Sequence, residues 1–257
     1  MESLTLFEAL FLGIVQGLTE FLPVSSSGHL VLTQALFDIS LPGVLLEVTV
    51  HLGTLFSILY IFREDIISLL KSLNSPETVT VIKNVFIGSL PIVVVGLFFQ
   101  DAIESLFDKP SIVGYCLLFT GLFLLTGRLA KNKSQTIGLR FALIIGFSQA
   151  VAILPGISRS GMTIGTCLLL GIAGGEATRF SFFLAIPAIL GSVVLTFSSG
   201  IQSQIPTEMM INLGASFITA FTVGVIALKL VVRSVKFGKF YMFGIYCLII
   251  GIISLWI

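Results

Sequence analysis

The side chains best suited to chemistry gather around two breaks in otherwise apolar sequence. The first break, 23–28, lies between Glu20 and His29, and the second break, 155–161, contains Arg159. A carboxylate can hold a metal ion or accept a proton, and a histidine can transfer a proton near neutral pH. A guanidinium binds phosphate through paired hydrogen bonds. This combination predicts a site for a phosphorylated substrate.

Each break ends in serine and glycine residues, which favour the start of a new helix. A helix N-terminus offers free N–H groups and a partial positive charge, so two such ends together would bind a multiply charged anion such as a diphosphate. Serine and threonine hydroxyls add further donors. The predicted substrate-binding residues are Gln16, Ser25, Ser27, Gly28, Gly156, Ser158, Ser160, Gly161 and Thr163.

Glu20 and Arg159 each have a structural alternative. Glu20 lies four residues after Gln16, so both side chains share a helix face that turns toward the first break. A membrane carboxylate can simply pair with an arginine, but we interpret Glu20 as a ligand for Mg²⁺ or Ca²⁺, or as a base. Arg159 could instead pin its turn by bonding carbonyls or a carboxylate, because an unpaired arginine in a bilayer is unfavourable. The surrounding serines and glycines favour phosphate binding.

Two histidines compete for the proton-transfer role. His29 lies one turn after Ser26, close enough to exchange a proton with that hydroxyl or to attack phosphorus itself. His51 lies inside an uninterrupted apolar stretch, and we interpret it as structural. The candidates for catalysis are Glu20, Ser26, His29 and Arg159, with Glu20 also the candidate metal ligand.

The composition places these residues in a membrane protein. Of 257 residues, 56% are hydrophobic and 11% are charged, and the mean hydropathy is +1.10. A soluble domain is usually about 25% charged, so an ordinary soluble enzyme is excluded. The net charge of +1 gives no indication of a nucleic-acid partner. No basic segment precedes the first apolar stretch, so we expect no cleavable signal peptide.

Charge patterning gives an orientation to the predicted membrane spans. Six stretches are long and apolar enough to cross a bilayer: 44–62, 84–100, 111–127, 181–198, 211–228 and 241–257. Most of the 14 lysines and arginines lie in the connections 63–83, 128–140 and 229–239, which we therefore place in the cytoplasm. The connections 101–110 and 199–210 are expected outside.

The two broken regions, 6–37 and 141–173, have short flanking pieces that suit re-entrant hairpins. Glycine, glutamine and serine recur in register: Gly13, Gln16, Ser25 and Gly28 match Gly146, Gln149, Ser158 and Gly161 at one constant offset. We predict an all-α polytopic membrane protein with an inverted-topology repeat, each half one re-entrant helical hairpin plus three transmembrane helices. The single domain, 1–257, would contain repeats at about 1–130 and 138–257, with both termini outside.

At these motifs the chain resembles a known family. Residues 16–29 and 154–163 look like the two signature motifs of the undecaprenyl-diphosphate phosphatase, or bacitracin-resistance, family. The resemblance implies a bacterial plasma-membrane enzyme that hydrolyses undecaprenyl diphosphate to undecaprenyl phosphate and inorganic phosphate on the outer face. The resemblance also implies that the reaction recycles the lipid carrier of cell-wall synthesis and uses a divalent cation. Bacitracin is expected to compete with the enzyme for the substrate.

By resemblance, the acidic motif of the family maps onto Gln16 and Glu20, its serine onto Ser26, its histidine onto His29 and its arginine onto Arg159. Many relatives carry a second glutamate at the position of Gln16, and a neutral amide cannot act as a base. The motif in this chain therefore supplies one carboxylate rather than two to a metal site. The alternative function is a transporter or flippase for a lipid-linked phosphate, because such proteins also use inverted repeats with broken helices. Homodimer formation is left open.

Overall fold

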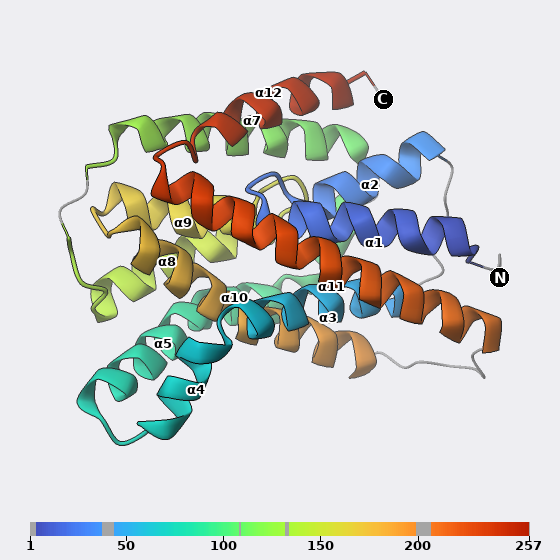
Figure 1. The fold of residues 1–257 in the computed structure, drawn as a ribbon. Helices are drawn as coiled ribbons and strands as arrows, with labels where there is room; N and C mark the ends of the chain where they lie inside the picture. Colours follow the sequence, from blue (N-terminus) through green and yellow to red (C-terminus); the bar gives the residue numbers. More distant parts are fainter. Residues whose placement is uncertain (1–3, 38–43, 108, 132–133, 199–206, 257) are drawn as a thin grey trace.

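The computed structural model describes residues 4–37, 44–107, 109–131, 134–198 and 207–256, and nearly all of these form helices (Figure 1). In these ranges the one extended pairing is an isolated bridge between Gln135 and Ile172. A helix satisfies every internal backbone hydrogen bond within one segment, which is what apolar surroundings require. The prediction of an all-α protein is confirmed.

Among the described residues, four helices are long and apolar enough to cross a membrane: α5 (Pro76–Phe98), α7 (Pro110–Thr126), α10 (Gly174–Ser198) and α11 (Thr207–Lys236). A fifth crossing is present if α3 (Val44–Ile61) and α4 (Arg63–Lys71), which are bent by 69°, count as one span. The last predicted span contains α12 (Met242–Ser254), a shorter apolar helix of 13 residues. The chain is therefore a polytopic membrane protein.

Both predicted breaks separate pairs of shorter helices. The first separates α1 (Leu6–Phe21) from α2 (Ser26–Phe37), and the second separates α8 (Leu139–Val151) from α9 (Arg159–Leu169). The short helices α6 (Gln100–Phe107) and η1 (Gly127–Leu129) occupy connecting segments.

Glycines of the repeated motif allow two equivalent close helix contacts. Helix α1 packs against α11, and α8 packs against α5. A Cβ atom at Gly13 would lie 2.8 Å from the Ser216 carbonyl oxygen on α11, and one at Gly146 would lie 2.3 Å from the Gly88 carbonyl oxygen on α5. Neither position has room for a side chain. This shared role supports the predicted duplication, whereas the opposed direction of the two halves stays a prediction.

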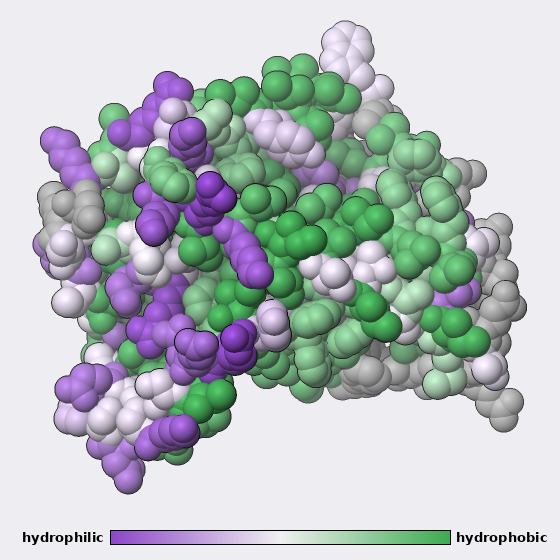
Figure 2. Space-filling model, in the orientation of Figure 1, coloured by the Kyte–Doolittle hydropathy of each residue, from purple (hydrophilic) through white to green (hydrophobic). Residues whose placement is uncertain are grey.

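Polar and apolar surfaces are separated along the molecule. The three lysine- and arginine-rich connections lie toward one end, at the left of Figure 1. Hydrophilic residues gather at the same end in Figure 2, and hydrophobic residues cover most of the remaining visible surface. One connecting side is therefore distinguished from the other by charge, as expected for a protein inserted in a bilayer.

Candidate active site

The two breaks lie in direct contact although they are far apart in sequence. The Gly156 N–H donates to Ser25 Oγ at 3.1 Å, and Ser160 Oγ donates to the Leu22 carbonyl oxygen at 3.3 Å. A Cβ atom at Gly28 would lie 3.0 Å from Gly156 Cα, so glycine is needed where the two backbones meet. The N-termini of α2 and α9 are thereby brought to one place.

The two breaks share a local hydrogen-bond pattern. Ser25 Oγ accepts from the Gly28 N–H at 3.3 Å, and Ser158 Oγ accepts from the Gly161 N–H at 3.1 Å. Each of these serines also lies within 3.3 Å of the hydroxyl two residues later. Ser25 has a φ of 70°, a left-handed backbone conformation that is unfavourable for residues other than glycine. The hydrogen bonds that Ser25 Oγ accepts from the N–H groups of Gly28 and Gly156 hold the backbone there.

A cavity of about 210 Å³ opens where the breaks meet. It contains the polar groups of both halves beside apolar residues of α5 and α10. The lining residues are Thr19, Glu20, Ser25, Ser26, Ser27, Glu47, His51, Ile92, Ala152, Ile153, Ile157, Ser158, Arg159, Ala188, Ile189 and Ser192.

Glu20 is the centre of the polar network in this cavity. Ser26 Oγ donates to Glu20 Oε2 at 2.6 Å, and Gln16 Nε2 donates to the same oxygen at 2.9 Å. The Arg159 guanidinium forms an ion pair with Glu20 Oε1, and its Nη1 donates to the Ala185 carbonyl oxygen at 3.3 Å. The structural alternatives considered for Glu20 and Arg159 are thus both present. A guanidinium has five N–H donors, so Arg159 can still bind a ligand in the cavity.

The two histidines lie in different surroundings from those expected. His51 lines the cavity, with Nε2 3.9 Å from Glu20 Oε2 and Nδ1 2.8 Å from the Glu47 carbonyl oxygen. Because a carbonyl only accepts, Nδ1 carries the proton and Nε2 of the neutral ring is free to accept one. The purely structural interpretation of His51 is therefore not supported by its position. Its spacing from Glu47, four residues on one helix face, is the signal that could have located it.

His29 does not line the cavity. Its Nδ1 lies 2.8 Å from the Ser25 carbonyl oxygen and its Nε2 lies 2.9 Å from the Tyr246 hydroxyl. The two rings also stack, with centroids 5.7 Å apart. In this structure His29 joins the first break to α12.

The other predicted residues divide into two groups. Ser25, Ser26, Ser27 and Ser158 lie on the cavity wall with Glu20 and Arg159. The remaining predicted residues do not line the cavity: Gln16, Gly28, Gly156, Ser160, Gly161 and Thr163. Gln16 is fully buried, and its Oε1 has no hydrogen-bond partner in the part of the chain that the structure describes. Thr163 Oγ1 donates to the Arg159 carbonyl oxygen at 2.8 Å, which holds the first turn of α9.

The described part of the cavity has too few metal-binding side chains to complete the coordination shell of a metal ion without a bound substrate. Within the described ranges there is no group of three or more His, Cys, Asp or Glu residues that could hold a metal. Two carboxylates, Glu20 and Glu47, do line the cavity. Mg²⁺ is often held by one or two carboxylates together with substrate phosphates and water. A divalent ion held by Glu20 and Glu47 would therefore need substrate phosphate and water to complete its ligands.

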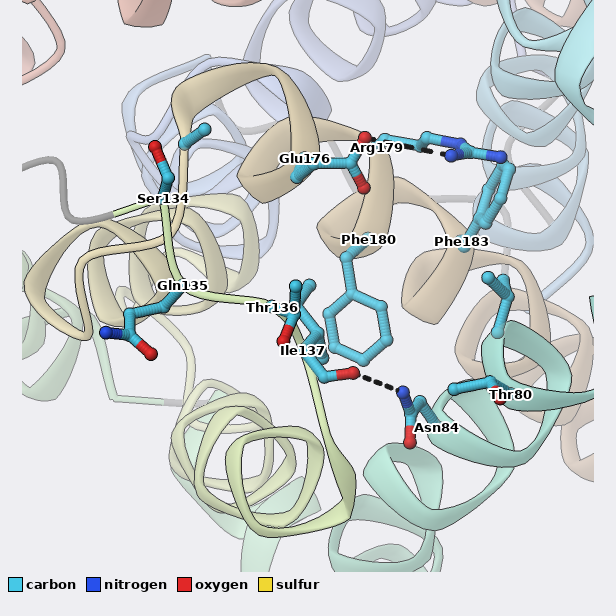
Figure 3. A pocket seen from close by; sticks show the side chains of 12 residues that line it. Thr80, Asn84, Ser134, Gln135, Thr136, Ile137, Glu176, Arg179, Phe180 and Phe183 are labelled. Atoms are coloured by element: carbon cyan, nitrogen blue, oxygen red, sulfur yellow. Dashed lines mark hydrogen bonds and ion pairs between the residues drawn. The ribbon is translucent and has the colours of Figure 1, made fainter. Parts of the chain in front are cut away.

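A second cavity, of about 350 Å³, lies between α5, α10 and the segment before α8 (Figure 3). Its Asn84 donates from Nδ2 to the Ile137 carbonyl oxygen at 2.6 Å. Its Arg179 is already paired, with Nε 3.0 Å from Asp65 Oδ1 and Nη1 3.8 Å from Glu176 Oε1. These contacts hold neighbouring segments together, so the polar side chains of the second cavity have structural roles.

Comparisons with known proteins agree on one family. A model of the family described as bacitracin resistance protein BacA matches residues 9–253. Three similar proteins named undecaprenyl-diphosphatase come from Christiangramia forsetii, Desulforapulum autotrophicum and Bacteroides fragilis. They are 43%, 39% and 42% identical to this chain, and each alignment covers 97% of the chain and 97% of the relative.

Proposed function

The chain belongs to the bacitracin resistance protein BacA family, and on that premise we propose that it is a membrane phosphatase acting on undecaprenyl diphosphate. It releases inorganic phosphate and undecaprenyl phosphate, the lipid carrier of cell-wall synthesis. Bacitracin competes for the same substrate. The transporter alternative is less well supported, because the full-length relatives are named as phosphatases.

One observation carries the assignment: the guanidinium of Arg159, two helix N-termini and the hydroxyl of Ser26 meet at one cavity. Arg159 and Ser26 are the first residues of α9 and α2, and both line the cavity. Free N–H groups at helix N-termini bind phosphate, and arginine adds charge-assisted hydrogen bonds. These groups can hold the diphosphate and stabilise negative charge as the bridging P–O bond breaks.

The chemistry centres on Ser26. Its hydroxyl oxygen attacks the terminal phosphorus or orients the attacking water, and the prenyl phosphate leaves. If serine is phosphorylated, water then releases inorganic phosphate; a histidine nucleophile is the third route. Quenching the reaction and identifying a phosphorylated residue distinguishes these routes.

We assign proton transfer to His51 because its free Nε2 faces Glu20 in the cavity. His51→Gln should lower kcat about 10²-fold or more, the usual contribution of general acid–base catalysis. The matched variant His29→Gln should retain most of the activity. The opposite result would return the role to His29.

Glu20 and Glu47 are proposed to hold a divalent cation, Mg²⁺ or Ca²⁺, together with substrate phosphate. When bound, the cation supplies neutralisation of charge on the transferring phosphoryl group. Chelation should stop phosphate release, and added Mg²⁺ or Ca²⁺ should restore it.

We place the cavity in the outer half of the bacterial plasma membrane. Ile92 and Ser192 line it from the last parts of α5 and α10, away from the starts of these helices near the basic connections. If those connections are cytoplasmic, the cavity opens outward. A cysteine at Ser105 should react with an impermeant thiol reagent from outside, and one at Lys131 should not.

Purified protein tests the proposed activity. It should release inorganic phosphate from a polyprenyl diphosphate, and Arg159→Ala should remove nearly all turnover. Arg128→Ala is the matched control, because Arg128 stacks on Tyr241 outside the cavity. Near-native turnover of Arg159→Ala would refute the assigned role, and no turnover of the unaltered protein would refute the function.

A further inference from the structure

Three cations form a stripe along the last two turns of α11. Lys229, Arg233 and Lys236 are spaced so that their side chains are neighbours on one face of the helix, and all three are exposed. Val231 and Val235, on the other side of the same turns, are buried. Like charges at this spacing repel one another and destabilise a helix. The stripe therefore needs a compensating negative charge.

The described part of the chain does not supply that charge. Within it, Lys229, Arg233 and Lys236 take part in no ion pair, whereas Arg63 and Arg179 each pair with a carboxylate. Cations in the last turn of a helix can be explained by the helix dipole, which accounts for Arg233 and Lys236. Lys229 lies about two turns before Lys236, beyond the reach of that effect. We therefore expect an anionic partner.

The stripe lines a cavity of about 360 Å³ between α11 and the end of α3. None of the described residues that line it is acidic, and the remaining ones are apolar. The lining residues are Ile61, Lys229, Val232, Arg233, Lys236 and Phe237. The cavity thus offers positive charge beside apolar surface, and a phospholipid has the complementary arrangement of a phosphate beside acyl chains.

Helix α11 is long enough to carry these cations beyond the hydrocarbon layer. Its 30 residues give a length of about 45 Å, whereas the hydrocarbon layer of a bilayer is about 30 Å thick. The apolar stretch 211–228 fills most of that layer, and Lys229 follows it directly. The last two turns of α11 therefore lie at the level of the lipid headgroups, at the end of the molecule that carries the basic connections (Figure 1).

We propose that the last two turns of α11 and the end of α3 bind the headgroup of an anionic phospholipid, such as phosphatidylglycerol. Its phosphate accepts hydrogen bonds from the three cations, and its acyl chains contact Ile61 and the exposed ring of Phe237. A zwitterionic lipid fits less well, because its own ammonium group would lie among these cations. The inference goes beyond the proposed phosphatase activity and does not depend on it.

Native mass spectrometry of the purified protein in detergent measures phospholipid binding to two triple variants of equal net charge. The site variant combines Lys229→Gln, Arg233→Gln and Lys236→Gln. The control variant changes three exposed cations that do not line this cavity, by Lys71→Gln, Lys83→Gln and Lys131→Gln. Affinity for phosphatidylglycerol should fall about 10²-fold in the site variant, because each basic residue contributes about fivefold. The control variant should bind it as the unaltered protein does.

Three results would overturn the inference. Equal losses in the two triple variants would indicate diffuse attraction by net charge, and equal affinity of the unaltered protein for phosphatidylglycerol and phosphatidylcholine would indicate no site for an anionic headgroup. Displacement of the bound lipid by inorganic phosphate would identify a free phosphate as the occupant. If the site variant does not fold, Arg233→Gln alone should lower the affinity about fivefold, and an unchanged affinity would again contradict the inference.

Discussion

Substitution can remove either charged partner of the ion pair between Glu20 and Arg159, or both partners together. Glu20→Gln removes the negative charge with no change in side-chain length, and Arg159→Met removes the positive charge and shortens the side chain by the end of the guanidinium. The two side chains are 5% and 17% exposed, so either single change leaves a largely buried charge without its counter-ion. Each should reduce the free energy of unfolding by about 3–5 kcal/mol. The double variant leaves no such charge and should lose no more than one single variant.

The assay measures thermal unfolding through cysteine thiols that are buried in the folded protein. Cys167 and Cys247 are fully buried and free, so a thiol-reactive fluorescent dye reports thermal unfolding in detergent. For a chain of this size, about 1 kcal/mol corresponds to about 2–4 °C in Tm, so each single variant should lose about 6–20 °C. All three variants should lack phosphatase activity, because phosphate binding needs the arginine and the reaction needs the carboxylate.

The exposed pair of Arg63 and Glu64 provides the control. Its atoms lie 3.6 Å apart, and the side chains are 52% and 87% exposed. Arg63→Met should change the free energy of unfolding by less than about 1 kcal/mol. If the loss of Tm in the double variant equalled the sum of the two single losses, Glu20 and Arg159 would not be coupled, and the reasoning would be refuted.

Three further changes test the elements that build the site, each by thermal unfolding. Ser25→Ala removes the hydroxyl that accepts from the Gly156 N–H and should cost about 1–3 kcal/mol; an unchanged Tm would remove Ser25 from the contact between breaks. Gly156→Ala should prevent stable folding, because φ is +97° and the new Cβ would lie 2.5 Å from the Val113 carbonyl oxygen. Asn84→Leu should cost about 1–3 kcal/mol by removing the buried donor to the Ile137 carbonyl oxygen, and a gain in Tm would contradict that account.

The helices and their breaks were predictable because their signals are local. Runs of apolar residues with no charge mark a span, and Pro23 and the following serines interrupt one such run. The predicted breaks at 23–28 and 155–161 agree with the ends of α1 and α8 to within a few residues. The last span is shorter than predicted, because α12 ends at Ser254.

The spacing of Glu47 and His51 indicates that they share a helix face, but the choice of histidine also depends on which face of α3 turns inward, and the sequence does not specify that. Gly53 lies against α11, where a Cβ atom would come within 2.6 Å of the Phe217 carbonyl oxygen. Two residues correspond to about 200° around a helix, so His51 points away from that contact. This rotation brings it to Glu20 on α1. Hydropathy along α3 contains no information about it.

By itself, the amino-acid sequence determined the membrane class, the positions of the two breaks and the residue types suited to phosphate, since each follows from composition or from neighbours along the chain. Tertiary structure alone decided that Arg159 pairs with Glu20 and that the two breaks meet at one cavity. Those features join helices far apart in sequence. They depend on packing at glycines such as Gly28 and Gly156, where only the absence of a side chain lets the backbones meet.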